Sequence, residues 1–207
     1  MKKIMFNDKY CLTQVVLSGT KTMTRRVEKP TEMADGYTME DVVTIFHEYS
    51  SLLNAHSFSL CDNEKKIGVL NPRYQVGEIV AIAQGYNDIG NPQYDKFGKE
   101  VAGNTNKMFV KSELMPHHIR ITDVKIERLR DISDDDIMRE GIRKDYYDGG
   151  CMFYYNKAYM LNENRYVEPI YNTTPIRAFA SLIYKICGGE VWRDNPFVVA
   201  YSFELVD

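Results

Sequence analysis

The segment from Phe197 to Val206 has the clearest structural pattern in the chain, because apolar residues occupy every second position from Phe197 to Leu205. Such alternation is typical of a β-strand. Two earlier segments, Ile79–Ala83 and Ile119–Leu129, also have strand-like patterns, and helical segments of unequal length separate them. The sequence therefore predicts an α+β chain with four or five strands. A small, mostly antiparallel barrel or sheet is favoured over a doubly wound parallel sheet, which needs regular alternation of strands and helices.

Within the predicted strand Ile119–Leu129 the alternation changes phase at Thr122 and Asp123. A β-bulge near Asp123 would restore it. A long loop is expected over residues 85–106, which are rich in Gly, Asn, Asp and Pro.

Several segments have helical patterns. Three of these helices are expected around Cys11–Val16, after Ser133, and from Thr174 to Cys187. A fourth helix is expected after Thr38, where a capping pattern precedes apolar residues at helical spacing: Val42, Val43, Phe46, Tyr49 and Leu53.

The overall charge does not indicate a nucleic-acid-binding protein. The 26 basic and 29 acidic residues give a formal net charge of −3, whereas such proteins usually carry a basic excess or a basic face. Positive charge is concentrated locally, in Lys21–Lys29 and in Arg120–Arg130. A near-neutral total is therefore compatible with a local anion-binding surface.

No segment resembles a signal peptide or a membrane span, so we expect a cytoplasmic protein without membrane contact. The four cysteines lie far apart and no known metal or cofactor motif is present. The sequence thus predicts ordinary thiols, no metal site and no cofactor.

Four segments, in this order, resemble the ASCH-domain family. They are LSGTKTMTRRVEKP (Leu17–Pro30), YQVGEIVAI (Tyr74–Ile82), ITDVKIERLRDISDDDIMREGI (Ile121–Ile142) and WRDNPFVVAYSFEL (Trp192–Leu205). The resemblance implies a single PUA-like β-barrel domain over residues 1–207, with peripheral helices and insertions at about 31–72 and 144–173. It also implies a cleft for a nucleobase, a nucleotide or RNA.

Some members of this family are amidohydrolases that deacetylate N4-acetylcytidine. Matching their motifs to this chain implies Lys21 as proton acceptor, Thr24 as nucleophile and Glu140 as proton donor. A threonine hydroxyl needs an adjacent base, and a lysine can serve if burial or nearby cations lower its pKa. The neighbouring cations Arg25, Arg26 and Lys29 are candidates for this effect and for binding a phosphate or an oxyanion.

Further candidate ligand-binding residues are Gln84, Tyr86 and His117. The first two stand where many phage-type relatives have an Arg-Glu-Thr-Trp-like run, so the group that orients substrate would differ here. His117 belongs to a His-His pair that would contact a ligand or simply begin a strand.

Whether the basic segment forms a catalytic site depends on its local backbone, and two other functions stay open. Lys21 and Thr24 are three residues apart, so on a regular strand they would point to opposite faces and would converge only if the chain bends. The alternative to an enzyme is a non-catalytic RNA-binding module that uses the basic cluster. A third possibility is a protein-interaction module that uses the tyrosine-rich segment Tyr146–Tyr171.

Overall fold

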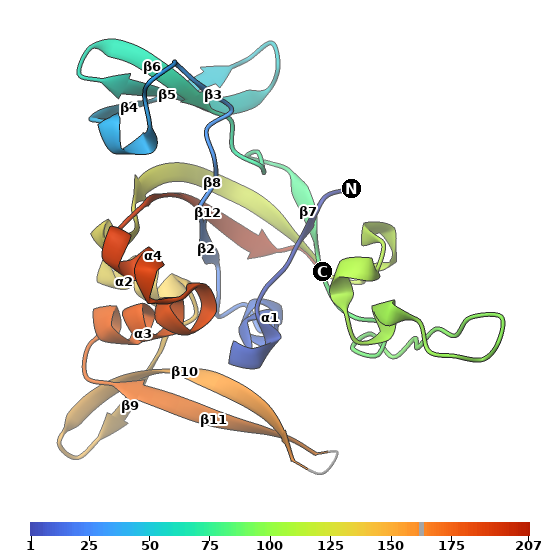
Figure 1. Cartoon of the computed structure of the whole chain (residues 1–207). Coiled ribbons are helices and arrows are strands. Elements are labelled where there is room, and N and C mark those ends of the chain that lie inside the picture. The colour runs from blue at the N-terminus through green and yellow to red at the C-terminus, as the bar shows by residue number, and fades with distance from the viewer. Residues whose placement is uncertain (162–163) are drawn as a thin grey trace.

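The computed structural model describes residues 1–161 and 164–207. Residues 162 and 163, which fall in the predicted insertion 144–173, lie outside this description. The described chain is a mixed α+β fold with twelve strands in three sheets, and antiparallel pairings dominate (Figure 1). The α+β class is therefore confirmed, whereas the expected four or five strands are too few.

The central sheet contains the strands that the sequence pattern predicts. Its strands, in spatial order, are β1 (Lys3–Ile4), β7 (Ile79–Ile82), β8 (His118–Arg128), β12 (Phe197–Leu205) and β2 (Met23–Arg26). The β1–β7 pairing is parallel and the other three are antiparallel. Within the described residues no pairing joins β1 to β2, so hydrogen bonds do not close this sheet into a barrel.

The predicted bulge is confirmed in the β8–β12 pair. Ser202 pairs with Asp123, but the next residue, Phe203, pairs with Ile121, so Thr122 is the extra residue. Every residue of β12 from Val198 to Phe203 is buried. Both faces of this strand are thus covered, although its alternation suggested one buried face.

Helices cover the central sheet and occupy the space beside it. They are α1 (Leu12–Leu17), α2 (Asp134–Arg139), α3 (Pro175–Cys187) and α4 (Gly189–Asp194). Single turns of 3-10 helix are η1 (Asp8–Tyr10), η2 (Met39–Asp41), η3 (Ala102–Asn104), η4 (Lys107–Phe109), η5 (Ser112–Leu114) and η6 (Leu129–Asp131). Helix α3 begins as predicted, with the Thr174 hydroxyl accepting from the backbone N–H of Arg177 at 3.3 Å. It buries Ala178, Phe179 and Leu182 in the main core.

The helix predicted after Thr38 is wrong. Thr38 caps only the single turn η2, and the chain then continues into β4 (Thr44–Ser50). This strand belongs to a second sheet, whose spatial order is β3 (Glu32–Met33), β6 (Lys65–Leu70), β5 (Ala55–Asp62) and β4. The β-branched run from Val42 to Ile45 favours a strand. Most of the apolar stripe also stays outside the core: Val42 is buried, but Phe46 is 54% exposed and Leu53 is 75% exposed.

The third sheet, β9 (Arg143–Tyr147), β10 (Gly150–Leu161) and β11 (Asn164–Asn172), lies on the far side of α3 from the central sheet (Figure 1). Tyr155 attaches it to the body of the protein. This side chain is buried against Tyr10, and its hydroxyl lies 2.8 Å from the Ser181 hydroxyl. Tyr146 and Tyr147 stay exposed at the β9–β10 turn.

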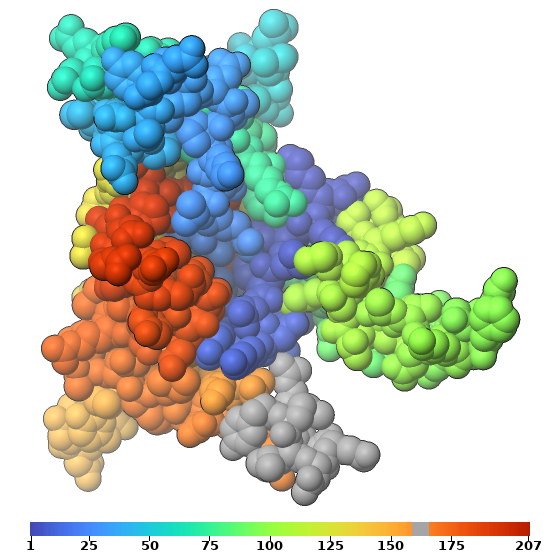
Figure 2. Space-filling model, in the orientation of Figure 1, coloured from blue at the N-terminus to red at the C-terminus, as the bar shows by residue number. Residues whose placement is uncertain are grey.

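The loop predicted over residues 85–106 is confirmed, with one short 3-10 turn and one isolated β-bridge in it. Together with the turns that follow, it forms the green arm that projects from the body in Figure 2. Among the described residues, none of the four cysteines forms a disulfide. Of the helices described, none is long and apolar enough to cross a membrane.

Candidate functional site

A cavity of about 780 Å³ lies between β2 and α3. One wall is apolar and comes mainly from Phe179, Leu182 and Ile183 of α3. The opposite wall is polar and contains five of the candidate residues: Lys21, Thr24, Arg25, Arg26 and Glu140. A cavity of this size, with an apolar wall and a few polar groups, is typical of a small-molecule site.

Lys21 and Glu140 form a buried ion pair on the polar wall. The Lys21 Nζ atom donates to Glu140 Oε2 at 2.5 Å and to the Glu140 backbone oxygen at 2.8 Å. The two side chains are only 2% and 6% exposed. Burial lowers the pKa of Lys21, because its ammonium loses water, and this effect exceeds the opposing attraction of Glu140.

The local backbone explains how Glu140 reaches Lys21. Glu140 is the C-cap of α2, and the next residue, Gly141, ends the helix with a φ of +96°. A Cβ atom on Gly141 would lie 3.1 Å from Val15 and 3.3 Å from the Lys21 Cβ atom. Glycine at this position thus permits both the turn and the close approach to Lys21.

Thr24 lies on β2, where it pairs with Tyr201, and it is 6% exposed. In the described chain, no residue makes a hydrogen bond with its hydroxyl. Lys21 precedes the strand, because a turn at Gly19 (φ +71°) follows α1 and the Lys21 N–H donates to the Val15 carbonyl at 2.8 Å. The alternation of a strand therefore does not separate Lys21 from Thr24, and both line one cavity.

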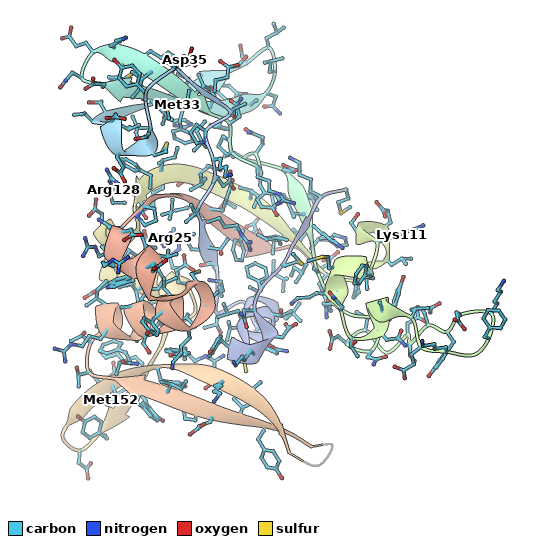
Figure 3. All side chains as sticks on the ribbon, viewed as in Figure 1. Arg25, Met33, Asp35, Lys111, Arg128 and Met152 are labelled. Atoms are coloured by element: carbon cyan, nitrogen blue, oxygen red, sulfur yellow. The ribbon has the colours of Figure 1, made fainter. Side chains whose placement is uncertain are left out.

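Arg25 is held inside the protein by three carboxylates. Its guanidinium lies 2.5 Å from Glu127, 3.1 Å from Asp136 and 3.0 Å from Glu140, and its side chain is 1% exposed. Figure 3 labels this residue in the region of α2 and α4. Although Arg25 borders the cavity, its charge is matched by carboxylates. Its evident effect is to hold Glu140 in place.

Arg26 is the better placed cation for contact with a ligand. Its Nη2 atom donates to the Met5 carbonyl at 2.7 Å, and its guanidinium lies 5.8 Å from the centre of the Phe6 ring. Its Nε atom is buried and has no hydrogen-bond partner among the described residues. An unpaired buried donor is costly, so a ligand oxygen at this point would be favoured.

The other four candidate ligand-binding residues are not brought to this cavity, as none of them belongs to its described lining. Lys29 is exposed after the end of β2. Tyr86 packs on a small second core, and the backbone N–H of Gln84 donates to Met115 Sδ of that same core at 3.2 Å. His117 lies near the end of the chain, with Nδ1 3.3 Å from the Asp207 carbonyl.

Sequence reasoning missed the carboxylates that support the site. The prediction that Ser133 caps α2 is confirmed, since its hydroxyl accepts from the Asp136 N–H at 3.2 Å. Asp136 has a further role, because its carboxylate also contacts Arg25, Lys125 and Arg139. In the sequence, the hint of this charged cluster was the basic Lys125 close to the acidic Glu127. Their spacing did not indicate that Asp136 would join them.

Sequence reasoning also missed Arg73 and Lys107 at the cavity, because each comes from a distant loop. The Lys107 ammonium is fixed by Asp8 at 2.7 Å and by the Phe6 carbonyl at 2.5 Å.

In the described part of the chain no group of three His, Cys, Asp or Glu residues could hold a metal ion. No protein-family model, no curated protein and no solved structure matches the chain.

Proposed function

We propose that the cavity binds a small N-acylated nucleobase-type ligand and hydrolyses its amide bond. The observation that carries this proposal is the buried Lys21–Glu140 pair, which lines the same cavity as the hydroxyl of Thr24. A nucleophile, a base and an acid are the three groups that a hydrolysis through a covalent acyl intermediate uses. The proposal includes the relationship to ASCH domains and a PUA-like barrel, with N4-acetylcytidine as the representative substrate.

The ion pair supplies acid and base together. Lys21 Nζ and Glu140 Oε2 are joined by a hydrogen bond of 2.5 Å, so a proton can pass directly between them. Burial lowers the pKa of Lys21, which favours its neutral amine. In the reactive form that we propose, the proton of this hydrogen bond lies on Glu140. In that form the amine accepts a proton and the carboxyl donates one, without any change in the total charge of the site.

In the first step the Lys21 amine takes the proton of the Thr24 hydroxyl, and Oγ1 forms a bond to the acyl carbon. The carbon–nitrogen bond then breaks, and its electron pair stays on the leaving nitrogen, which takes the proton of Glu140. The products are a free amino group on the base and an acyl ester on Thr24. Lys21 is now an ammonium and Glu140 a carboxylate.

In the second step water attacks the ester and gives a proton to the Glu140 carboxylate. The bond between the acyl carbon and Thr24 Oγ1 breaks, and the threonine oxygen takes a proton back from Lys21. The acid is released, and both residues return to their starting forms. Arg26, whose Nε atom has no described partner, is the candidate donor to the negative oxygen that develops in each step.

Hydrolysis of N4-acetylcytidine, followed by ultraviolet absorbance, tests this proposal. We expect turnover by the wild-type protein and a loss of about 100-fold or more in Lys21→Ala and in Thr24→Ala, because each variant loses a group that takes part in bond making. Lys29→Ala is the matched control, since Lys29 is exposed in the same basic segment and does not line the cavity. It should keep wild-type turnover.

Absence of turnover by the pure wild-type protein would refute the hydrolytic proposal. Turnover at the wild-type rate by both cavity variants would also refute it. Binding of N4-acetylcytidine or of single-stranded RNA without turnover would instead support the non-catalytic alternative. In that case the loss of binding in Arg26→Ala would locate the ligand in this cavity.

A further inference from the structure

A second hollow of about 590 Å³ is rich in basic residues, and it has no described lining residue in common with the cavity. Its described lining includes Thr20, Arg139, Arg143, Lys144 and Tyr154. It shares two chain segments with the cavity, because Thr20 and Arg139 immediately precede Lys21 and Glu140. A backbone hydrogen bond of 2.9 Å, from the Thr22 N–H to the Arg139 carbonyl, joins these two segments.

Arg143 is the residue that most clearly lacks a partner in this hollow. It is the first residue of β9, it is half-buried, and its Nε atom is buried without a hydrogen-bond partner among the described residues. A buried guanidinium N–H without a hydrogen-bond partner destabilises the folded protein. The Nε atom itself is covered, so a ligand that brings acceptor oxygens into the hollow would meet the other guanidinium nitrogens of Arg143, which also have no partner among the described residues.

The charge of Arg139 is also available to a ligand. Its Nη1 atom lies 3.3 Å from Asp136, but that carboxylate is already contacted by Lys125 at 2.7 Å and by Arg25 at 3.1 Å. The Arg139 side chain is 41% exposed, so it can turn toward a ligand. Arg25 and Lys125 also pair with Glu127, whereas Asp136 is the carboxylate that Arg139 contacts and it serves all three cations. Part of the positive charge of Arg139 is therefore left at the hollow.

The remaining residues of the hollow suit a nucleotide. Thr20 places a hydroxyl at its edge, 3.0 Å from the Ser18 hydroxyl. Tyr154 places an aromatic ring on its wall, with the Tyr171 ring 5.3 Å away. Lys144 borders the hollow, but its ammonium lies 4.8 Å from the Tyr146 ring, so it contributes long-range attraction more than direct contact. Paired guanidinium groups match the oxygens of a phosphate, which they bind through charge-assisted hydrogen bonds.

We propose that this hollow binds a phosphate group through Arg143 and Arg139, and that the ligand of the cavity is therefore a phosphorylated nucleoside rather than a free one. The first part stands on the hollow alone, and the second rests on the proposed function. The phosphate could be the monoester of a mononucleotide or the diester of an RNA chain, since both offer the same oxygens.

Calorimetric titration of the full chain at low salt tests the proposal with three probes: cytidine, cytidine 5′-monophosphate and the dinucleotide CpC. We expect at least one of the two phosphorylated probes to bind about tenfold or more tightly than cytidine, from one or two charge-assisted hydrogen bonds. Preference for the monophosphate would identify a monoester site, and preference for CpC a diester site. Equal affinity for all three probes would overturn the proposal.

Arg143→Gln should reduce this preference about tenfold or more, and Arg139→Gln is a second variant in case the first fails to fold. Arg120→Gln is the matched control, because Arg120 is an exposed strand arginine paired with Glu204 and does not line the hollow. If both hollow variants fold and keep the full preference, the phosphate does not lie in this hollow. Because binding is measured without turnover, failure of hydrolysis and failure of phosphate binding remain distinguishable.

Discussion

Replacing Arg25 with methionine should be among the most destabilising single changes in the protein. The Arg25 side chain is 1% exposed and lies within 3.1 Å of Glu127, Asp136 and Glu140. Removing the guanidinium leaves Lys125 as the remaining partner of Glu127, and Glu140 with Lys21 alone. Loss of one member of a buried ion pair typically costs about 3–5 kcal/mol, because the other charge stays buried without compensation.

Urea denaturation followed by circular dichroism measures this loss. For a chain of this length, about 3–5 kcal/mol corresponds to a fall in Tm of about 6–20 °C. The matched control is Arg120→Met, which breaks an arginine–carboxylate pair with Glu204 whose side chains are 45% and 55% exposed. An exposed pair contributes about 0–1 kcal/mol. If Arg25→Met cost no more than Arg120→Met, the argument that the buried carboxylates depend on Arg25 would be refuted.

Two further changes test the backbone and the pH dependence. Gly141→Ala should lower the free energy of unfolding, measured in urea, by about 1–3 kcal/mol, because this position combines a φ of +96° with a close approach to Lys21. The control Gly36→Ala, at φ +81° with nothing within 4 Å, should lower it by less. Equal losses in the two variants would contradict the steric argument. Burial and the neighbouring His47 lower the pKa of His56 below its ordinary 6.5. Below pH 6.5 the unfolded chain therefore binds more protons at this residue than the folded one, and the free energy of unfolding falls as the pH falls. His56→Gln should flatten this fall in urea midpoints measured on both sides of pH 6.5, and an unchanged slope would count against it.

The central sheet could be predicted from the sequence because its signals are local. The alternation of Phe197–Leu205 and the change of phase at Thr122 each report on one strand and its immediate shape. The helix expected after Thr38 was wrong, because Phe46 and Tyr49 of its apolar stripe lie in the strand β4 (Thr44–Ser50). The strand is stabilised by pairing with β5 (Ala55–Asp62), and no local pattern in the sequence predicts that pairing.

The candidate site could be predicted only in part, and for a similar reason. Motif matching picked out Lys21, Thr24 and Glu140, and the fold brings all three to one cavity. Their catalytic roles stay a prediction. Arg25 is buried by its pairing with carboxylates such as Asp136, which is 111 residues away in the sequence. A local sequence pattern cannot predict a contact between residues so far apart. The residues chosen at 84, 86 and 117 were placed by their sequence neighbourhood alone, and the fold puts them elsewhere.

Peptide mapping by mass spectrometry after rapid quenching tests the central claim most directly. The account predicts that protein mixed with N4-acetylcytidine carries an acetyl ester on Thr24, and that Thr24→Val, which removes the hydroxyl but keeps the shape, carries none. Glu140→Gln should form little or no ester, because its amide cannot protonate the leaving nitrogen. Turnover without acetylated Thr24, or an acetyl group that forms equally in Thr24→Val, would contradict the account.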